Sequence, residues 1–463
     1  MRHVRLRTAG GALLAVSLAL ALAGRAAAHG GSLRSAPARS LAIPLWLFLS
    51  TGGGVVGVSF LLTSFVTDRE LIRAVHDARR DLALPGGLRT ALGIAARLLG
   101  LAGLVAVLLV GVFGPVDPLR NLGVLVVWVG WWAGYTMTTY LAGNSWPALN
   151  PWRVALDLRE RLPAPALDYP ERLASWPAVV GLLGFVWLEV VSPLADDPRL
   201  LAGVVAVYTL VTLAGAYALG EVWFDRVDPV ARVFTAYGAV APLYRDDDGR
   251  LRARVPGTGL EADLLRDRSD VAFVVALLWV TTYDGLVATP PWRDFAQAVV
   301  GAGVPAVLLY PAALLAGFGT FLVLFRWAVR RGRRDAESYR DPLVLARRFA
   351  PSLLAIAAGY HVAHYLGYFV ELSPALLGVL GSPLSPGAPV AVVLPSWFSV
   401  LALGFVLLGH LVAIWVAHAV AYDLFPSRMQ AVRSQYALTA VMVFYTMTSL
   451  WIVSRPYAAP PFV

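Results

Sequence analysis

Long apolar runs separated by short polar segments are the dominant pattern along the chain. After residue 28, ten runs hold about 20 mostly apolar residues each, the length a helix needs to cross a bilayer. The pattern predicts an all-α fold: a polytopic transmembrane helical bundle of about ten spans that forms a single domain over residues 29–463. The predicted spans are 43–66, 92–114, 121–143, 174–194, 199–223, 269–287, 303–328, 346–371, 394–421 and 434–453.

Residues 1–28 have the three parts of a secretory signal. Three arginines precede an apolar run, and the small residues Ala26, Ala27 and Ala28 suit a cleavage site. Cleavage after Ala28 makes His29 the first mature residue; an uncleaved first span is the alternative. A free amine beside an imidazole chelates copper when a further histidine joins, so His29 is a candidate copper ligand. The alternative is that His29 follows the cleavage site by chance and binds no metal.

The arginine distribution predicts the orientation. A cleaved signal places the mature N-terminus outside, and ten further spans return the C-terminus to the same side. Most arginines of the mature chain then fall in loops predicted to be cytoplasmic, as the positive-inside rule requires. We therefore expect a multi-pass protein of the plasma membrane with both mature termini outside. The segments predicted outside carry only six arginines: Arg34, Arg39, Arg120, Arg199, Arg293 and Arg455.

Composition narrows the classes of function. The chain is 58% hydrophobic and 14% charged, whereas soluble domains carry about a quarter charged residues. The net charge of +9 lies in short loops between spans, so we expect the lipid bilayer and no nucleic acid as partner. Association with other membrane subunits stays open. The absence of cysteine excludes disulfides, thiolate metal sites and cysteine nucleophiles.

Two segments are expected at the membrane surface, near 150–162 and 224–268. Asn150 is a good N-cap and Pro151 suits the first helical position, which predicts a short interfacial helix. Within 224–268, Asp248 and Gly249 between short apolar stretches predict a β-hairpin. Amphipathic indole rings favour membrane edges, where we expect four tryptophans. These are Trp131, Trp132, Trp146 and Trp152.

Four of the seven histidines fall in two consecutive predicted spans. His361 and His364 are three residues apart and share a helix face, which Tyr365 extends. The next span runs antiparallel, which brings His410 to the depth of His361 and places His418 nearer the inside. We therefore predict a metal site of His361, His364 and His410, with His418 as an orienting or relay group.

Nitrogen ligands suit zinc, copper or iron. Haem b held by two axial histidines is an alternative, and hydrogen bonding between helices is another. Asp284 lies deep enough in a predicted span to orient a ligating histidine or to act as a general base, so it is the candidate catalytic residue. Glu189 is a second acid within a predicted span. A transporter is expected to contain a broken helix, and Pro305 and Pro311 mark the candidate.

These features together resemble the multi-span membrane proteins of high-GC bacteria called fenitrothion hydrolase. The resemblance covers most of the chain. It implies the same fold and the hydrolysis of an organophosphate-like ester. A transporter or metal-handling permease, and a haem-binding redox subunit, are the alternative functions. The residues that carry the resemblance are His29–Gly30, Ile43–Phe48, Asn150–Arg153, Tyr283–Gly285, Ala363–Tyr365, Gly409–His410 and Ala417–His418.

Overall fold

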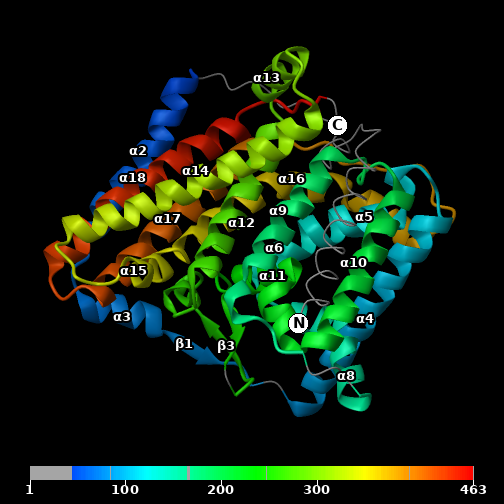
Figure 1. Cartoon of the computed structure of the whole chain (residues 1–463), viewed down its shortest axis with the longest axis horizontal. Coiled ribbons are helices and arrows are strands. Elements are labelled where there is room, and N and C mark those ends of the chain that lie inside the picture. Colours follow the sequence, from blue (N-terminus) through cyan, green and yellow to red (C-terminus); the bar gives the residue numbers. More distant parts are fainter. Residues whose placement is uncertain (1–43, 84, 164–166, 247, 396, 462–463) are drawn as a thin grey trace, which may run out of the picture.

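The computed structural model describes residues 44–461, apart from 84, 164–166, 247 and 396. The predicted signal and His29 lie outside this range. The described chain is a bundle of long helices, which confirms the all-α polytopic fold (Figure 1). Eight of its helices are long and apolar enough to cross a membrane. They are α2 (Leu45–Ser64), α4 (Gly86–Phe113), α10 (Pro198–Leu219), α12 (Arg268–Val287), α14 (Ala306–Asp335), α16 (Ser352–Gly381, after α15, Pro342–Phe349), α17 (Phe398–Leu424) and α18 (Arg428–Val453).

The other two predicted spans are also helical, but one is short and one contains a π-helical segment. Span 174–194 corresponds to α9 (Trp176–Val191), which has 16 residues. Span 121–143 consists of α5 (Leu122–Leu125), the π-helix η3 (Val126–Tyr135) and α6 (Thr136–Leu141). By contrast, α14 continues through Pro311. The prediction of a broken helix at Pro305 and Pro311 is therefore wrong, and the span that departs from α-helical geometry is the third.

The connecting segments collect at two opposite ends of the bundle (Figure 1). At one end, which we call the sheet end, lie α3 (Arg69–Asp77) and an antiparallel sheet of order β1–β3–β2. The strands are β1 (Arg79–Asp81), β2 (Leu243–Arg245) and β3 (Leu251–Arg254). The pairing of β2 with β3 confirms the predicted hairpin. At the other end, the α13 end, α13 (Pro290–Gly301) lies near the C-terminal segment, where Ala458 N donates to Ala288 O.

The predicted capped helix at 150–162 is confirmed. Asn150 Oδ1 accepts a hydrogen bond from Trp152 N at 3.0 Å, and a 3-10 turn, η4 (Pro151–Arg153), leads into α8 (Val154–Arg161). Trp152 itself is buried in the protein. Its indole donates to Thr209 Oγ1 of α10 at 3.0 Å, so its one polar group finds a partner inside the protein.

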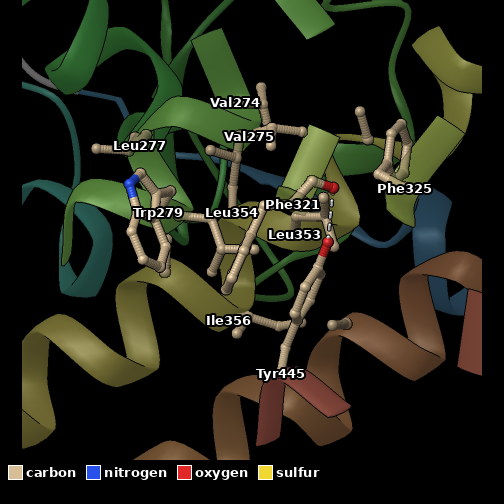
Figure 2. Packing of buried hydrophobic residues seen from close by; sticks show 14 of the residues in the cluster. Val274, Val275, Leu277, Trp279, Phe321, Phe325, Leu353, Leu354, Ile356 and Tyr445 are labelled. Carbon is tan, nitrogen blue, oxygen red and sulfur yellow. Dashed lines mark hydrogen bonds between the residues drawn. The ribbon is translucent and has the colours of Figure 1, made fainter. Parts of the chain in front are cut away.

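Helix α12 is the central element of the bundle (Figure 1). Its residues from Val271 to Val280 are apolar on every side except for the indole N–H of Trp279, a pattern typical of a helix surrounded by others. The most apolar stretch of α12 is 94% buried. Figure 2 shows the packing beside it, where Tyr445 donates to Phe321 O at 3.0 Å and stacks on the Phe321 ring.

Helices α16 and α17 cross with their backbones in contact, at a pair of glycines. A Cβ atom on Gly359 would lie 2.9 Å from Gly409 Cα and 2.6 Å from Phe405 O. Small residues permit this close approach between helices in membranes. Because Gly359 and Gly409 precede Tyr360–His361 and His410 respectively, the crossing sets where these histidines lie.

Candidate functional site

A cavity of about 480 Å³ lies among α4, η3, α9, α10, α12, α16 and α11 (Pro229–Gly238). Its walls are almost entirely apolar and aromatic, with the polar groups of Glu189, Thr281, Asp284 and Tyr365 among the lining residues. A wall of this kind fits a lipophilic molecule that carries one polar group. The four tryptophans expected at membrane edges lie in this wall. Its aromatic residues are Trp128, Trp131, Trp132, Tyr135, Trp146, Trp152, Phe185, Tyr208, Phe234 and Tyr365.

Asp284 is the centre of the polar part of the cavity. It lies in the last turn of α12, near the α13 end, and its side chain is 11% exposed. Tyr365 of α16 donates its hydroxyl hydrogen to Asp284 Oδ2 at 2.7 Å. His364 Nε2 lies 3.4 Å from the same oxygen. The structure therefore brings together three of the predicted site residues, Asp284, His364 and Tyr365.

His361 lies on α16, as His364 and Tyr365 do, but in different surroundings. It is fully buried, and its Nδ1 shares a hydrogen bond of 3.0 Å with the hydroxyl of Tyr140 in α6. Its ring also meets Tyr365, Trp132 and Tyr237, with centroids 4.6, 5.6 and 6.0 Å away. We did not predict the partners Tyr140 and Tyr237, since no local motif marks them.

The remaining two predicted histidines make separate contacts. His410 is fully buried and donates from Nδ1 to Val406 O of its own helix at 2.8 Å. His418 donates from Nε2 to Val66 O at 2.9 Å, and Gln435 approaches its other nitrogen at 3.4 Å. These contacts connect α17 to the segment after α2 and to α18. His418 therefore has structural partners on other helices. It does not join the group of Asp284, His364 and Tyr365, which we call the Asp284 group.

The predicted metal ligands do not form a metal site in the described part of the chain. No group of three or more His, Cys, Asp or Glu residues able to hold a metal ion occurs there. A porphyrin between α16 and α17 also has no space at the level of Gly359 and Gly409, where the two backbones touch.

Metal analysis of a double variant tests this separation of the histidines. We expect His361→Ala with His410→Ala to leave the metal content of the purified protein equal to that of the wild type, because neither ring belongs to a group of three ligating side chains in the described part of the chain. Elemental analysis by mass spectrometry measures both proteins. A stoichiometric metal in the wild type that the double variant lacks would contradict the contacts described here.

Asp228 supports one wall of the cavity from the segment between α10 and α12. It is buried, caps α11 through Val230 N and Ala231 N, and accepts a hydrogen bond from Tyr208, which lines the cavity. Burial raises the pKa of this carboxyl from its usual 3.8 to about 6, although these hydrogen bonds oppose the rise.

The raised pKa of Asp228 predicts a pH dependence of stability. The protonated carboxyl contributes to the free energy of unfolding. This contribution is fully present below pH 3.8 and is lost as the pH rises through 6, a loss of about 3 kcal/mol in total. Asp228→Asn keeps an oxygen for the cap and for Tyr208 but does not titrate. As the pH is raised from 4 to 7, we expect the thermal unfolding midpoint of the wild type to decrease relative to that of this variant. Parallel curves for the two proteins would show that Asp228 does not titrate in this range.

Comparison with known proteins gives no match to a family model, a curated protein or a solved structure.

Proposed function

We propose that the protein binds a lipophilic small molecule in this cavity and hydrolyses an ester bond in it. The observation that carries the proposal is the hydrogen-bonded pair Asp284–Tyr365, which lines an almost entirely apolar cavity and has His364 beside it. An apolar wall binds the body of such a molecule by removing its surface from water. The polar group of the ligand then meets the few side chains able to hydrogen-bond it.

The Asp284 group has the residue types needed to activate water. A carboxylate beside an imidazole nitrogen holds the ring in one orientation, and the ring or the carboxylate can take a proton from water. The oxygen of that water attacks the phosphorus or carbonyl carbon, and the alcohol or phenol leaves with a proton returned by the same group. The family resemblance implies organophosphate-like esters, which are uncharged and lipophilic enough to enter such a cavity.

The orientation of the site in the membrane is part of the proposal. The arginine-rich connections gather at the sheet end, which we place in the cytoplasm. The α13 end, with Asp284 near it, then faces the outside of the plasma membrane. A lipophilic ester would reach the site from the outer half of the bilayer.

Transport of a lipophilic molecule is the second candidate function. The π-helix η3 favours it, because this segment lies within the third predicted span and its residues line the cavity. Wide helical turns of this type are frequent at functional sites. Under this alternative, Asp284 and Tyr365 would bind the cargo and would break no bond in it.

A pair of glycine substitutions on α4 tests the proposed function. Gly103 lines the cavity and Gly93 does not, and a Cβ atom at either position meets no atom within 4 Å. Gly103→Phe should fill the cavity, whereas Gly93→Phe adds the same side chain elsewhere on the helix. The wild type and both variants, in lipid nanodiscs, are given diethyl 4-nitrophenyl phosphate and 4-nitrophenyl butyrate. Release of 4-nitrophenolate is followed by absorbance.

We expect hydrolysis of at least one ester by the wild type and by Gly93→Phe, with a loss of at least about tenfold in Gly103→Phe. Equal rates in the two variants would show that the cavity is not the site. No hydrolysis by the wild type contradicts esterase activity towards these substrates. Retention of the intact ester inside wild-type proteoliposomes, but not Gly103→Phe proteoliposomes, would then favour transport.

A further inference from the structure

Buried hydroxyl and imidazole groups extend from the Asp284 group towards the opposite end of the bundle. Asp284 belongs to the last turn of α12, near the α13 end, whereas Tyr237 belongs to the last turn of α11, near the sheet end (Figure 1). Between them lie Tyr365, His361 and Tyr140. We propose that these three side chains are a proton-exchange path through the bundle, which connects the carboxyl group of the cavity with Tyr237.

The contacts along the path come from four different elements. Tyr365 donates to Asp284 at 2.7 Å, and the Tyr365 ring lies 4.6 Å from the His361 ring between centroids. His361 Nδ1 and the Tyr140 hydroxyl are 3.0 Å apart. The Tyr140 and Tyr237 rings meet edge to face at 5.2 Å. Each group can both donate and accept a hydrogen bond, which proton exchange requires.

One group at the end of this path has no hydrogen-bond partner among the described residues. The Tyr237 hydroxyl is fully buried and makes no hydrogen bond there, whereas His361 contacts both the Tyr140 hydroxyl and the backbone of Trp132. Leaving a buried polar atom unpaired is costly, and such atoms in a folded protein call for a reason. Proton exchange is a reason, because a relay group needs a second site that is open when the first is occupied.

The path is isolated from competing charges along its middle. The titratable groups that face His361 are Tyr365 and His364 on its own helix, Tyr140 on α6, Tyr237 on α11 and, beyond Tyr365, Asp284 on α12. The π-helix η3 also packs against His361, and there it contributes the uncharged ring of Trp132. A proton that enters at Asp284 therefore meets no arginine along these contacts.

Transfer along the path leaves no charge behind. His361 takes a proton at one ring nitrogen and releases the other ring proton, while each tyrosine accepts one proton and gives up its own. The two steps without a hydrogen bond, Tyr365 to His361 and Tyr140 to Tyr237, require a ring rotation or one bridging water. The path ends at the Tyr237 side chain; the backbone carbonyl of the next residue, Gly238, accepts a hydrogen bond from Arg254 of β3 at 3.1 Å.

Hydrogen–deuterium exchange at the histidine rings tests this path without any substrate. The full-length protein, labelled with ¹⁵N-histidine in lipid nanodiscs, is moved into D₂O at neutral pH, and the ring N–H signals are followed by NMR. His410 is a matched internal control, because it is as fully buried as His361 and bonds only to its own helix. His361→Gln and His410→Gln variants assign the two signals.

We expect the His361 ring proton to exchange at least about tenfold faster than that of His410 in the wild type. Tyr140→Phe with Tyr365→Phe keeps both rings and removes both hydroxyls, and should slow His361 to the rate of His410. Equal rates in the wild type, or a His361 rate unchanged in the double variant, would overturn the proposal. If faster His410 exchange shows that the double variant is loosened, Tyr140→Phe alone decides between the same two outcomes.

Discussion

Asp284→Asn is expected to lower kcat for ester hydrolysis by about 10²- to 10⁴-fold, the range lost when a general base is removed. The amide oxygen can still accept the hydrogen bond from Tyr365, so the geometry of α12 against α16 is kept. What is lost is the group that we propose takes the proton or orients His364. We therefore expect kcat to fall much more than KM rises. Rates in lipid nanodiscs over a range of ester concentrations measure both.

Asp294→Asn is the matched control for this prediction. Asp294 is an exposed residue of α13 whose recorded ion pair is with its neighbour Arg293, so its loss should leave kcat unchanged. A wild-type kcat in Asp284→Asn would exclude Asp284 from the chemistry. A selective rise in KM would instead indicate that Asp284 only binds the ester, as a transporter would require.

Gly409→Ala is expected to destabilise the protein by about 1–3 kcal/mol, the cost of overpacking a tight interface. The new Cβ atom would lie 2.6 Å from Ala355 O and 3.0 Å from Gly359 Cα, both of them backbone atoms that cannot rotate away. The two helices must therefore move apart. Because α16 carries His361, His364 and Tyr365, activity should fall together with stability. Thermal unfolding in detergent measures the first effect.

Gly404→Ala on the same helix is the control, because a Cβ atom there meets no atom within 4 Å. Alanine favours helix more than glycine does, so this variant should be as stable as the wild type or slightly more so. If Gly409→Ala and Gly404→Ala unfold at the same temperature, the close crossing of α16 and α17 is wrong.

The fold was predictable from the sequence where the pattern of residues within one helix is enough to identify that helix. Bilayer thickness sets the length of an apolar run, so all ten predicted spans correspond to helices. Local chemistry also predicted the Asn150 cap and the hairpin between β2 and β3. The π-helix η3 was not predictable in this way. Its residues are as apolar as those of an ordinary span, and only the packing around the cavity distinguishes it.

The candidate site was predictable in part. Asp284 was predicted as a site residue because a carboxylate within a span is costly. Its contacts with His364 and Tyr365 depend on how α12 packs against α16. We grouped His361 with His410 because the sequence places the two at similar depth in the membrane. Depth alone does not specify the direction in which a side chain leaves its helix. His361 points to Tyr140, whereas His410 bonds to its own backbone.

The tryptophans show the same limit. Indole rings are common both at membrane edges and in the walls of cavities, and a single sequence does not distinguish the two. Trp152 and its neighbours in the cavity lie beside segments that connect spans, which made the membrane edge the expected place. The pairing of Trp152 with Thr209 depends on how α10 packs, which is a property of the whole bundle.

Photocrosslinking tests most directly the central claim that the cavity is where a lipophilic ester binds. A phosphotriester carrying an aliphatic diazirine is added to the protein in lipid nanodiscs and irradiated, and the labelled residues are identified by mass spectrometry. We predict labels on residues that line the cavity, Glu189 and Asp284 among them, and their loss when excess unlabelled triester competes. Labels confined to lipid-exposed residues of α2 or α14, unchanged by the competitor, would contradict the claim.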